Sequence, residues 1–262
     1  MTEARSMGSN TGLKPWATHL PPRGGLILIV PHSLMWFQSA ISIWYTPISM
    51  EKNDPLQPVR EREPRWPALI ALLAVIGLYV ALPDFLTLGH TWLVISVLLV
   101  AAAALVATYR TGRHDLNHNL GIAVNGLTTA MMVGSVVLLI KTLPEHKEAP
   151  EALLRSAAGL WITNILVFAA WYWRLDAGGP NQRDLRNHHH EGAFLFPQMA
   201  TKHATWSPQF VDYLFLAFNT STALSPADTQ ALSRWAKLLM MLQALISLTI
   251  IVLLVARSVN IM

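Results

Sequence analysis

Four consecutive residues in the second half of the chain carry side chains that can ligate a metal ion: His188, His189, His190 and Glu191. Imidazole nitrogens and carboxylate oxygens bind zinc, nickel or copper. Adjacent side chains diverge along an extended chain, however, so four neighbours in sequence are poorly placed to converge on one ion. We therefore interpret the run as a solvated polar loop, with a pH-responsive contact or a metal site as alternatives, and expect no metal or other cofactor.

A second group of polar residues precedes the last apolar run: Thr220, Ser221, Thr222, Ser225, Pro226 and Asp228. A Ser-Pro pair followed by an acidic residue is typical of a helix N-terminus, with Ser225 as the N-cap and Pro226 in the first helical position. The last helix would then run from Pro226 to Ala256, with Asp228 in its third position. In the alternative interpretation, these residues line a conduction path.

Spacings that enzymes use are missing from this sequence. No serine, histidine and acidic residue are placed as in a hydrolase, and no glycine-rich phosphate loop follows a strand. The chain has no cysteine, which excludes thiolate metal sites and cysteine nucleophiles. Arg174 and Asp176 follow an aromatic run at residues 171–173, and we expect them to form an ion pair at the membrane interface. The sequence predicts no enzyme.

These polar residues lie in a chain that is too apolar for a soluble domain. Of its 262 residues, 53% are hydrophobic and 13% are charged, whereas globular proteins carry about 25% charged residues. A membrane-spanning helix needs about 20 apolar residues. Five runs meet this length: Trp66–Leu82, Thr91–Tyr109, Leu120–Ile140, Leu153–Trp173 and Ala236–Ala256. The sequence predicts an all-α bundle of about five transmembrane helices, with a re-entrant or amphipathic helix before the last.

Polar and small residues inside these runs are expected to join the helices. Hydrocarbon offers no hydrogen-bond partner, so polar side chains there must find one within the bundle. They are Asn125, Thr128, Thr129, Thr163, Asn164 and Gln243. Gly126, Ala130 and Gly134 recur at four-residue spacing on one helix face, which permits close packing of a neighbouring helix. A substrate path is the alternative for the polar group.

The first 65 residues differ from the transmembrane domain, which covers residues 66–262. Residues 1–24 are rich in Gly, Pro, Ser and Thr, as in a disordered tail. Residues 26–48 are apolar but interrupted by a proline, and their polar and apolar side chains separate on a helical wheel, which is typical of an interfacial helix. The linker Glu51–Arg65 contains eight charged residues and three prolines, so we expect it to be solvated. Met50 is an alternative start.

The distribution of Lys and Arg predicts the orientation. Twelve of them lie on the linker's side of the bundle, and four lie on the other side: Lys141, Lys147, Arg155 and Arg257. Because basic residues favour the cytoplasmic side, we place the linker there and expect a multi-pass protein of the cell (inner) membrane. The net charge of +4 then reflects this orientation, and we expect no nucleic-acid partner.

Residues Gln209–Asn260, within a segment covering residues 206–260, resemble the pore module of two-helix bacterial potassium channels. The matching features are a short apolar helix, a Thr-rich turn that ends in an acidic residue, and a long inner helix that closes in VAR. The resemblance implies a re-entrant helix and an oligomeric pore. Potassium filters need glycines, but Ser225 and Ala227 stand in their place, and Pro226 fixes φ. A conventional potassium filter is therefore not expected.

Residues Trp66–Met262 also resemble a family of bacterial integral membrane proteins of unknown function. The motifs are LPDFLTLGHTW at Leu82–Trp92, WYWRLDAGGP at Trp171–Pro180, FLFPQM at Phe194–Met199, and the later SPADT and RWAK runs. This resemblance implies the fold and carries no activity.

Together these features predict an oligomeric channel-like protein that passes an ion or a small solute. Its partners would be the lipid bilayer and further copies of the same chain, since a pore of this type needs several subunits around an axis. The alternative is a non-conducting membrane scaffold or accessory protein, which the missing filter glycines favour.

Overall fold

The computed structural model describes residues 63–142, 149–185, 192–200, 206–222 and 228–259. All of them belong to the second of two compact units, residues 58–262. The tail and the helix expected over residues 26–48 lie outside the described residues, so those predictions are not tested.

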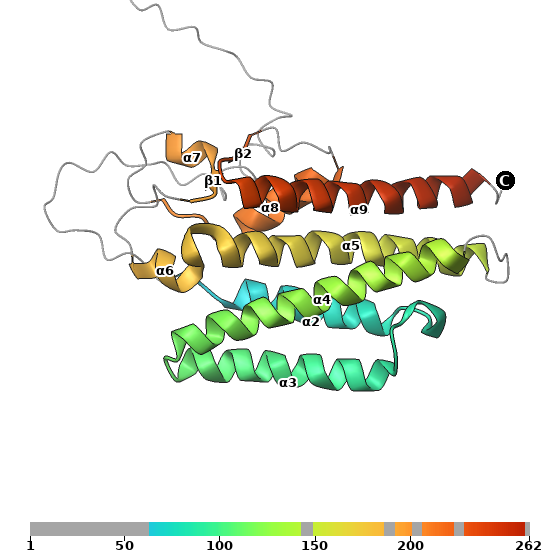
Figure 1. Ribbon diagram of the computed structural model, residues 1–262, viewed down its shortest axis with the longest axis horizontal. Helices are drawn as coiled ribbons and strands as arrows, with labels where there is room; N and C mark the ends of the chain where they lie inside the picture. The colour runs from blue at the N-terminus through green and yellow to red at the C-terminus, as the bar shows by residue number, and fades with distance from the viewer. Residues whose placement is uncertain (1–62, 143–148, 186–191, 201–205, 223–227, 260–262) are drawn as a thin grey trace, which may run out of the picture. The chain divides into compact units, whose positions relative to one another are not determined.

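The described part of the chain is mainly helical, which confirms the all-α fold (Figure 1). Its long helices are α2 (Trp66–Val80), α3 (Thr91–Arg110), α4 (His114–Thr142), α5 (Pro150–Leu175) and α9 (Arg234–Val259). Shorter elements lie between them: η2 (Asp84–Leu86), η4 (Asp176–Gly178), α6 (Pro180–Leu185), α7 (Pro197–Ala200) and α8 (Phe210–Thr222). Two short strands, β1 (Phe194–Leu195) and β2 (Gln230–Ala231), pair antiparallel.

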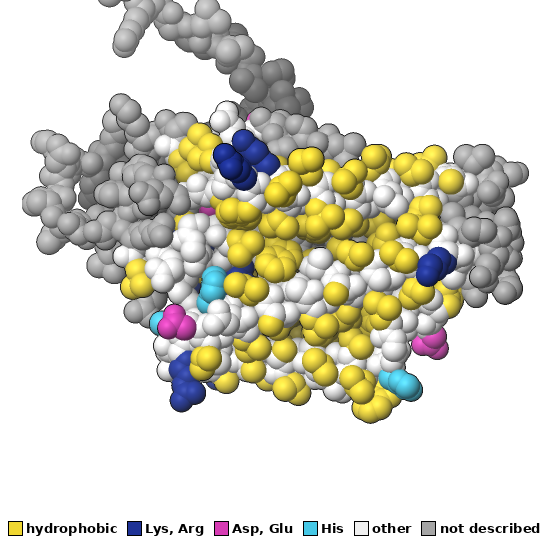
Figure 2. Space-filling model, viewed as in Figure 1, with side chains coloured by type: hydrophobic (Ala, Val, Ile, Leu, Met, Phe, Trp, Pro, Cys, Tyr) yellow, Lys and Arg dark blue, Asp and Glu magenta, His cyan; other side chains and the backbone are white. Residues whose placement is uncertain are grey.

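Four helical stretches are long and apolar enough to cross a bilayer: Thr91–Arg110, His114–Thr142, Glu151–Leu185 and Arg234–Ala256. Helix α2, which the sequence predicts as a further span, has 15 residues. At about 1.5 Å per residue it covers about 22 Å, less than an apolar bilayer core of about 30 Å. Figure 2 shows hydrophobic side chains over the middle of one face and charged side chains toward the helix ends. The architecture is that of an integral membrane protein with four candidate spans.

Helices α5 and α3 occupy opposite positions in the packing. Helix α5 packs against α2, α4, α8 and α9 and lies between α9 and α4 in Figure 1. Helix α3 packs against α2 and α4 at the edge of the bundle. Only 11% of the most apolar stretch of α3 is buried within the chain, against 56% for the stretch that contains α5. Lipid can solvate large apolar side chains, so the exposed face of α3 suits a membrane.

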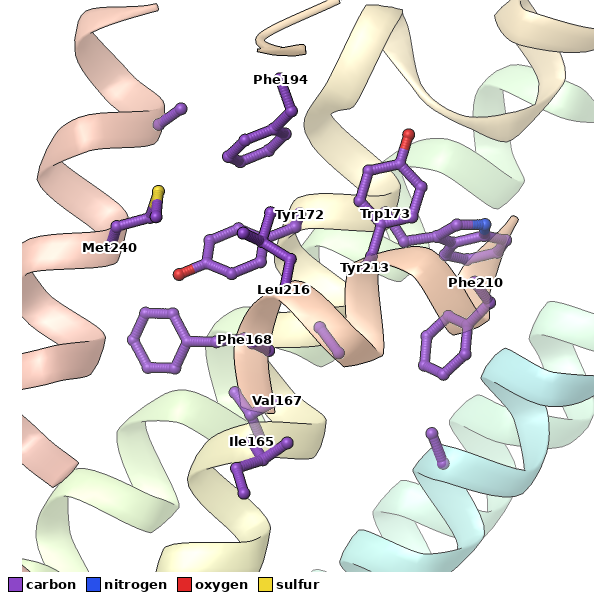
Figure 3. Close-up of a cluster of buried hydrophobic side chains, with 14 of the residues drawn as sticks. Ile165, Val167, Phe168, Tyr172, Trp173, Phe194, Phe210, Tyr213, Leu216 and Met240 are labelled. Atoms are coloured by element: carbon purple, nitrogen blue, oxygen red, sulfur yellow. The ribbon is translucent and has the colours of Figure 1, made fainter. Parts of the chain in front are cut away.

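Aromatic side chains fill the core where α5, α8, α9 and β1 meet (Figure 3). The ring centroids of Tyr172 and Phe194 are 5.2 Å apart, and those of Trp173 and Phe210 are 5.8 Å apart. Both pairs meet edge to face, which is a favourable arrangement of aromatic quadrupoles. Because the cluster joins the end of α5 to α8, it holds the segment after α5 against the bundle.

The start of the last helix differs from the prediction. Helix α9 begins at Arg234, and the backbone N–H of Ala236 donates to the hydroxyl of Ser233 over 3.2 Å, so Ser233 is the N-cap. Residues 228–233 are not helical. Their backbone pairs with the segment around β1 instead: β2 pairs with β1, and the N–H of Leu232 donates to the carbonyl of Ala193 over 2.8 Å. A last helix that runs from Pro226 is therefore wrong, and Asp228 is exposed outside the helix.

Candidate functional site

Several residues proposed from the sequence lie outside the described residues: His188, His189, His190, Glu191, Ser225 and Pro226. The roles of the histidines and of Glu191 stay predictions. Ser225 as N-cap of the last helix and Pro226 as its first residue are wrong, because α9 begins at Arg234 with Ser233 as its N-cap. Within the described ranges, no group of three or more His, Asp and Glu residues is placed to hold a metal ion. The polar clusters and the cavity among the described residues are therefore the candidates for a functional site.

The Thr-rich end of α8 faces the interior of its own bundle. Thr220 is buried, and its hydroxyl donates to the carbonyl of Leu216 over 2.8 Å. Ser221 is fully buried and accepts a hydrogen bond of 2.8 Å from the side-chain amide of Gln243. Thr222 is exposed, and its hydroxyl donates to Phe218. Thr220 and Ser221 therefore serve contacts within one chain and do not present a shared polar surface.

Gln243 joins three helices through hydrogen bonds. Its carbonyl oxygen accepts from the hydroxyl of Tyr172 on α5 at 2.5 Å, and its amide donates to Ser221 on α8. The backbone carbonyl of Gln243 accepts from the amide of Asn164 at 3.3 Å. One turn on, the hydroxyl of Ser247 donates to the carbonyl of Ser221 at 2.9 Å. The predicted role of Asn164 and Gln243 in helix contacts is confirmed.

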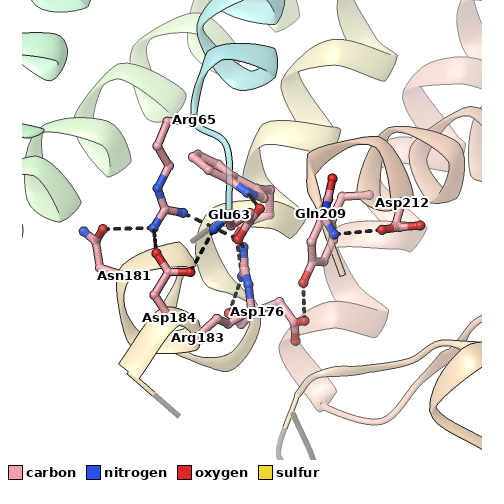
Figure 4. Close-up of polar contacts among 10 residues, drawn as sticks. Glu63, Arg65, Asp176, Asn181, Arg183, Asp184, Gln209 and Asp212 are labelled. Atoms are coloured by element: carbon pink, nitrogen blue, oxygen red, sulfur yellow. Dashed lines mark hydrogen bonds and ion pairs between the residues drawn. The ribbon is translucent and has the colours of Figure 1, made fainter. Parts of the chain in front are cut away.

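A buried ion pair lies where the end of the linker meets α5 and α6 (Figure 4). The guanidinium of Arg183 is 2.9 Å from one carboxylate oxygen of Glu63, and the indole N–H of Trp173 donates to the other. Arg183 also donates to the backbone carbonyls of Trp173 and Asp176. Glu63 is 6% exposed, so the expected solvated linker is wrong at this residue.

Asp176 sits next to this pair and binds the segment after α6. One carboxylate oxygen accepts the N–H of Ala193 at 2.5 Å, and the other accepts the hydroxyl of Tyr213 at 2.6 Å. Burial raises the pKa of Tyr213 well above its ordinary value, so this hydroxyl stays protonated and acts as a donor. Both carboxylate oxygens of Asp176 thus accept hydrogen bonds, one from α8 and one from the residue that precedes β1.

The chain turns sharply directly after Asp176, which is the C-cap of α5. Ala177, Gly178 and Gly179 have φ values of 51°, 79° and 91°. Glycine reaches such angles without penalty, and a Cβ on Gly179 would lie 2.7 Å from the carbonyl oxygen of Arg174. Arg174 and Asp176 are two positions apart at the end of α5, so their side chains do not share a face of the helix. Arg174 packs against α4, whereas Asp176 binds Tyr213 on α8. The predicted ion pair between Arg174 and Asp176 is therefore wrong.

A partly open cavity of about 280 Å3 lies between α2, α3, α4 and α5. Apolar side chains form most of its walls, among them Leu69, Leu72, Leu105 and Val124. Polar side chains gather where these helices end on the linker's side: Arg65, Arg110, Asn117 and Arg174. Asn125 and Thr128 lie deeper along α4. The cavity lining contains no acidic side chain among the described residues.

Arg174 fits against α4 because residue 121 is glycine. A Cβ at Gly121 would lie 1.9 Å from the guanidinium carbon of Arg174, so any other residue would displace this side chain. Arg174 is 8% exposed and donates to the carbonyl of Asn117 over 3.3 Å. Its Nε has no hydrogen-bond partner, and the same holds for the amide nitrogen of Asn125. With the Nε of Arg65, three buried donors of residues that line this cavity thus lack an acceptor in the described chain.

Arg65 connects the cavity to the buried ion pair. Its guanidinium is 2.5 Å from Asp184 and 3.5 Å from Glu63. It also lies over the rings of Tyr109 and Trp173, with centroid distances of 5.9 and 5.8 Å. Arg65 is thus compensated by carboxylates on one side and forms part of the cavity lining on the other.

A polar stripe on α4 borders the cavity and was not predicted from the sequence. Asn117, Gly121 and Asn125 recur at four-residue spacing, which places them on one face of α4. This spacing could have identified the site, because two side-chain amides form a polar helix face and the glycine between them leaves space for a side chain from another helix. The predicted small-residue stripe is open at Gly126, where a Cβ would meet nothing within 4 Å. At Gly134 the prediction of close packing is confirmed, because a Cβ there would lie 2.1 Å from the side chain of Leu88.

Comparison of the chain with protein families, with curated proteins and with solved structures finds no match. The resemblances to a family of unknown function and to a potassium-channel pore module therefore stay predictions.

Proposed function

We propose that this protein is a non-conducting integral membrane protein that binds an amphiphile between α2, α3, α4 and α5. The observation that carries the proposal is the cavity of about 280 Å3, with apolar walls and a polar end. Ligand sites are mostly apolar concavities in which a few polar groups orient the ligand. A molecule with one polar end and an apolar body matches that distribution.

The surrounding helices favour a ligand drawn from the bilayer. Helix α3 forms one wall of the cavity, and its outer face exposes Trp92, Val97 and Val100. In a membrane these side chains would contact lipid. The polar end of the cavity lies at the helix ends that carry most of the Lys and Arg residues. We therefore place the polar group of the ligand at that interface and its apolar body between the helices.

The channel-like function expected from the sequence would need Thr220 and Ser221 to face a conduction path. Their burial inside a single chain favours the non-conducting alternative instead. We infer that α8 is the inward half of a re-entrant segment, because Ser221 contacts Ser247 halfway along α9 and the chain has returned to β1 by Gln230. This segment would then close the bundle. Assembly into an oligomer stays a prediction.

Photolabelling tests the proposal directly. Full-length protein in lipid nanodiscs is exposed to palmitic acid and to hexadecanol, each with the same diazirine in its chain. We expect labelled peptides from α2 to α5. Leu105→Trp fills the cavity, and overfilling costs about 1–3 kcal/mol, so labelling by the preferred probe should fall about tenfold or more.

The matched control is Leu99→Trp on the same helix, because Leu99 is 46% exposed and does not line the cavity. This variant should label like the parent. Labelling that is spread over lipid-facing surfaces and unchanged by Leu105→Trp would refute the proposal. In liposomes we expect no flux of potassium, sodium or chloride, and a flux that Ser221→Ala alters would restore the channel-like function.

A further inference from the structure

Arg174 differs from the other two arginines of this region, Arg183 and Arg65. Arg183 and Arg65 each have a carboxylate within 3 Å. Arg174 makes no ion pair among the described residues, although it is 8% exposed. A cation that is buried without a counter-charge is strongly unfavourable, and more so between membrane helices. An anion from outside the described residues would supply the missing counter-charge.

The position of Arg174 excludes the simplest alternative, in which the side chain extends to the aqueous interface. Its guanidinium packs over Gly121, within the bundle, and donates to the carbonyl of Asn117. The ring of Trp173 lies 5.4 Å away. These contacts hold the guanidinium at the polar end of the cavity and leave its Nε without a partner. The arginine is thus oriented before any ligand arrives.

We infer that the ligand of the cavity is an amphiphile with an anionic headgroup, a carboxylate or a phosphate, that pairs with Arg174. The inference rests on the proposed function and adds the charge of the ligand. Arg110 also lines the cavity and is exposed, so it adds positive charge at the same end. The absence of acidic side chains from the described lining removes any competitor for these cations.

The cavity also provides space for the chain of such a ligand. Its lining follows α2 from Arg65 to Val75, a distance of about 15 Å at about 1.5 Å per residue. Leu69 and Leu72 line this path. The amide of Asn125, which has no acceptor, lies two turns along α4 from Asn117. It can donate to an oxygen placed further along the ligand, such as an ester carbonyl.

Paired probes that differ only in charge test the inference. The first pair is diazirine-labelled palmitic acid and hexadecanol; the second is lysophosphatidic acid and monoacylglycerol with the same labelled chain. We expect the anionic member of at least one pair to label the cavity about tenfold more than its neutral counterpart, as loss of a charged hydrogen-bond partner implies. The pair with the larger ratio distinguishes a carboxylate ligand from a phosphate ligand.

Variants assign this preference to Arg174. Arg174→Gln should reduce labelling by the anionic probe to the level of the neutral one. The matched control, Arg155→Gln, removes the same charge from an exposed position on the same helix and should retain the preference. Gly121→Ala keeps the charge but displaces the guanidinium, so it should also lose the preference. This second variant decides the matter if Arg174→Gln does not fold.

The outcomes separate the two proposals. Equal labelling of the cavity by charged and neutral probes, still blocked by Leu105→Trp, would overturn the anionic ligand and leave the proposed function standing. A preference for the anion that persists in both Arg174→Gln and Gly121→Ala would also overturn it. Labelling outside the cavity by every probe would refute the proposed function itself.

Discussion

Two arginines nine residues apart in sequence, Arg174 and Arg183, are both buried yet have opposite surroundings. Arg183 is 2% exposed, pairs with Glu63 and donates to two backbone carbonyls. Arg174 is 8% exposed, donates to one carbonyl over 3.3 Å and borders an apolar cavity. In the first region a carboxylate of the same chain neutralises the arginine. In the second, no carboxylate among the described residues pairs with it.

This difference separates a structural role from a binding role. A buried cation that is paired with a carboxylate holds its surroundings together, and breaking such a pair costs about 3–5 kcal/mol. A buried cation without a counter-charge destabilises the ligand-free protein, so replacing it should cost little. Substitutions in the two regions should therefore have unequal effects on stability.

The largest effect is expected for Glu63→Gln. The amide cannot neutralise Arg183, which would leave this buried charge without its paired carboxylate, and the free energy of unfolding should fall by about 3 kcal/mol or more. Thermal unfolding in detergent measures this change. Glu151→Gln is the control, since Glu151 pairs with Arg155 at an exposed site and should lose about 0.5 kcal/mol or less. Equal melting temperatures for both variants would contradict a structural role of the Arg183 region.

An intermediate effect is expected for Gln243→Leu, which breaks a buried network without charge. The hydroxyls of Tyr172 and Ser221 would lose their partner, and stability should fall by about 1–2 kcal/mol. Unfolding in the same detergent gives the comparison with Glu63→Gln. Thr249→Val is the control, because the Thr249 hydroxyl bonds only within its own helix. A loss above that of Glu63→Gln would show that the neutral network, not the ion pair, dominates.

A smaller effect is expected for Asp184→Asn. Asp184 pairs with Arg65 at the edge of the cavity, and the two side chains are 20% and 14% exposed. Partial solvation weakens such pairs, so the loss should be about 1 kcal/mol. Arg65 would retain its longer contact with Glu63. A loss of about 3 kcal/mol in the melting experiment would mean that Arg65 belongs to the buried structural region.

The smallest effect is expected for Arg174→Met in ligand-free protein. Replacing a buried charge that has no partner by an apolar side chain of similar length should leave stability within about 1 kcal/mol of the parent, or raise it. The measurement is the melting temperature after removal of bound lipid. A loss as large as that of Glu63→Gln would show that Arg174 is compensated within the chain.

Sequence patterns predicted the membrane helices better than the site. Long apolar runs correctly located α3, α4, α5 and α9, and Gln243 was correctly expected to join helices. The Ser-Pro pattern at residues 225–226 wrongly predicted the start of α9, because strand pairing with β1 satisfies the backbone of residues 228–233 instead. A cap pattern describes local preference only, and tertiary contacts override it.

By itself the sequence determined the membrane class, the approximate spans and the side of the bundle that carries most basic residues. These properties depend on the composition of single runs, because a bilayer requires about 20 apolar residues at each crossing. Only the tertiary structure decided which arginine is paired. Glu63 meets Arg183 across 120 residues of sequence, while Asp176, only two residues from Arg174, binds Tyr213 on α8 instead. Whether a charged side chain is compensated depends on which groups lie near it in space, and the order of residues in the sequence does not show this.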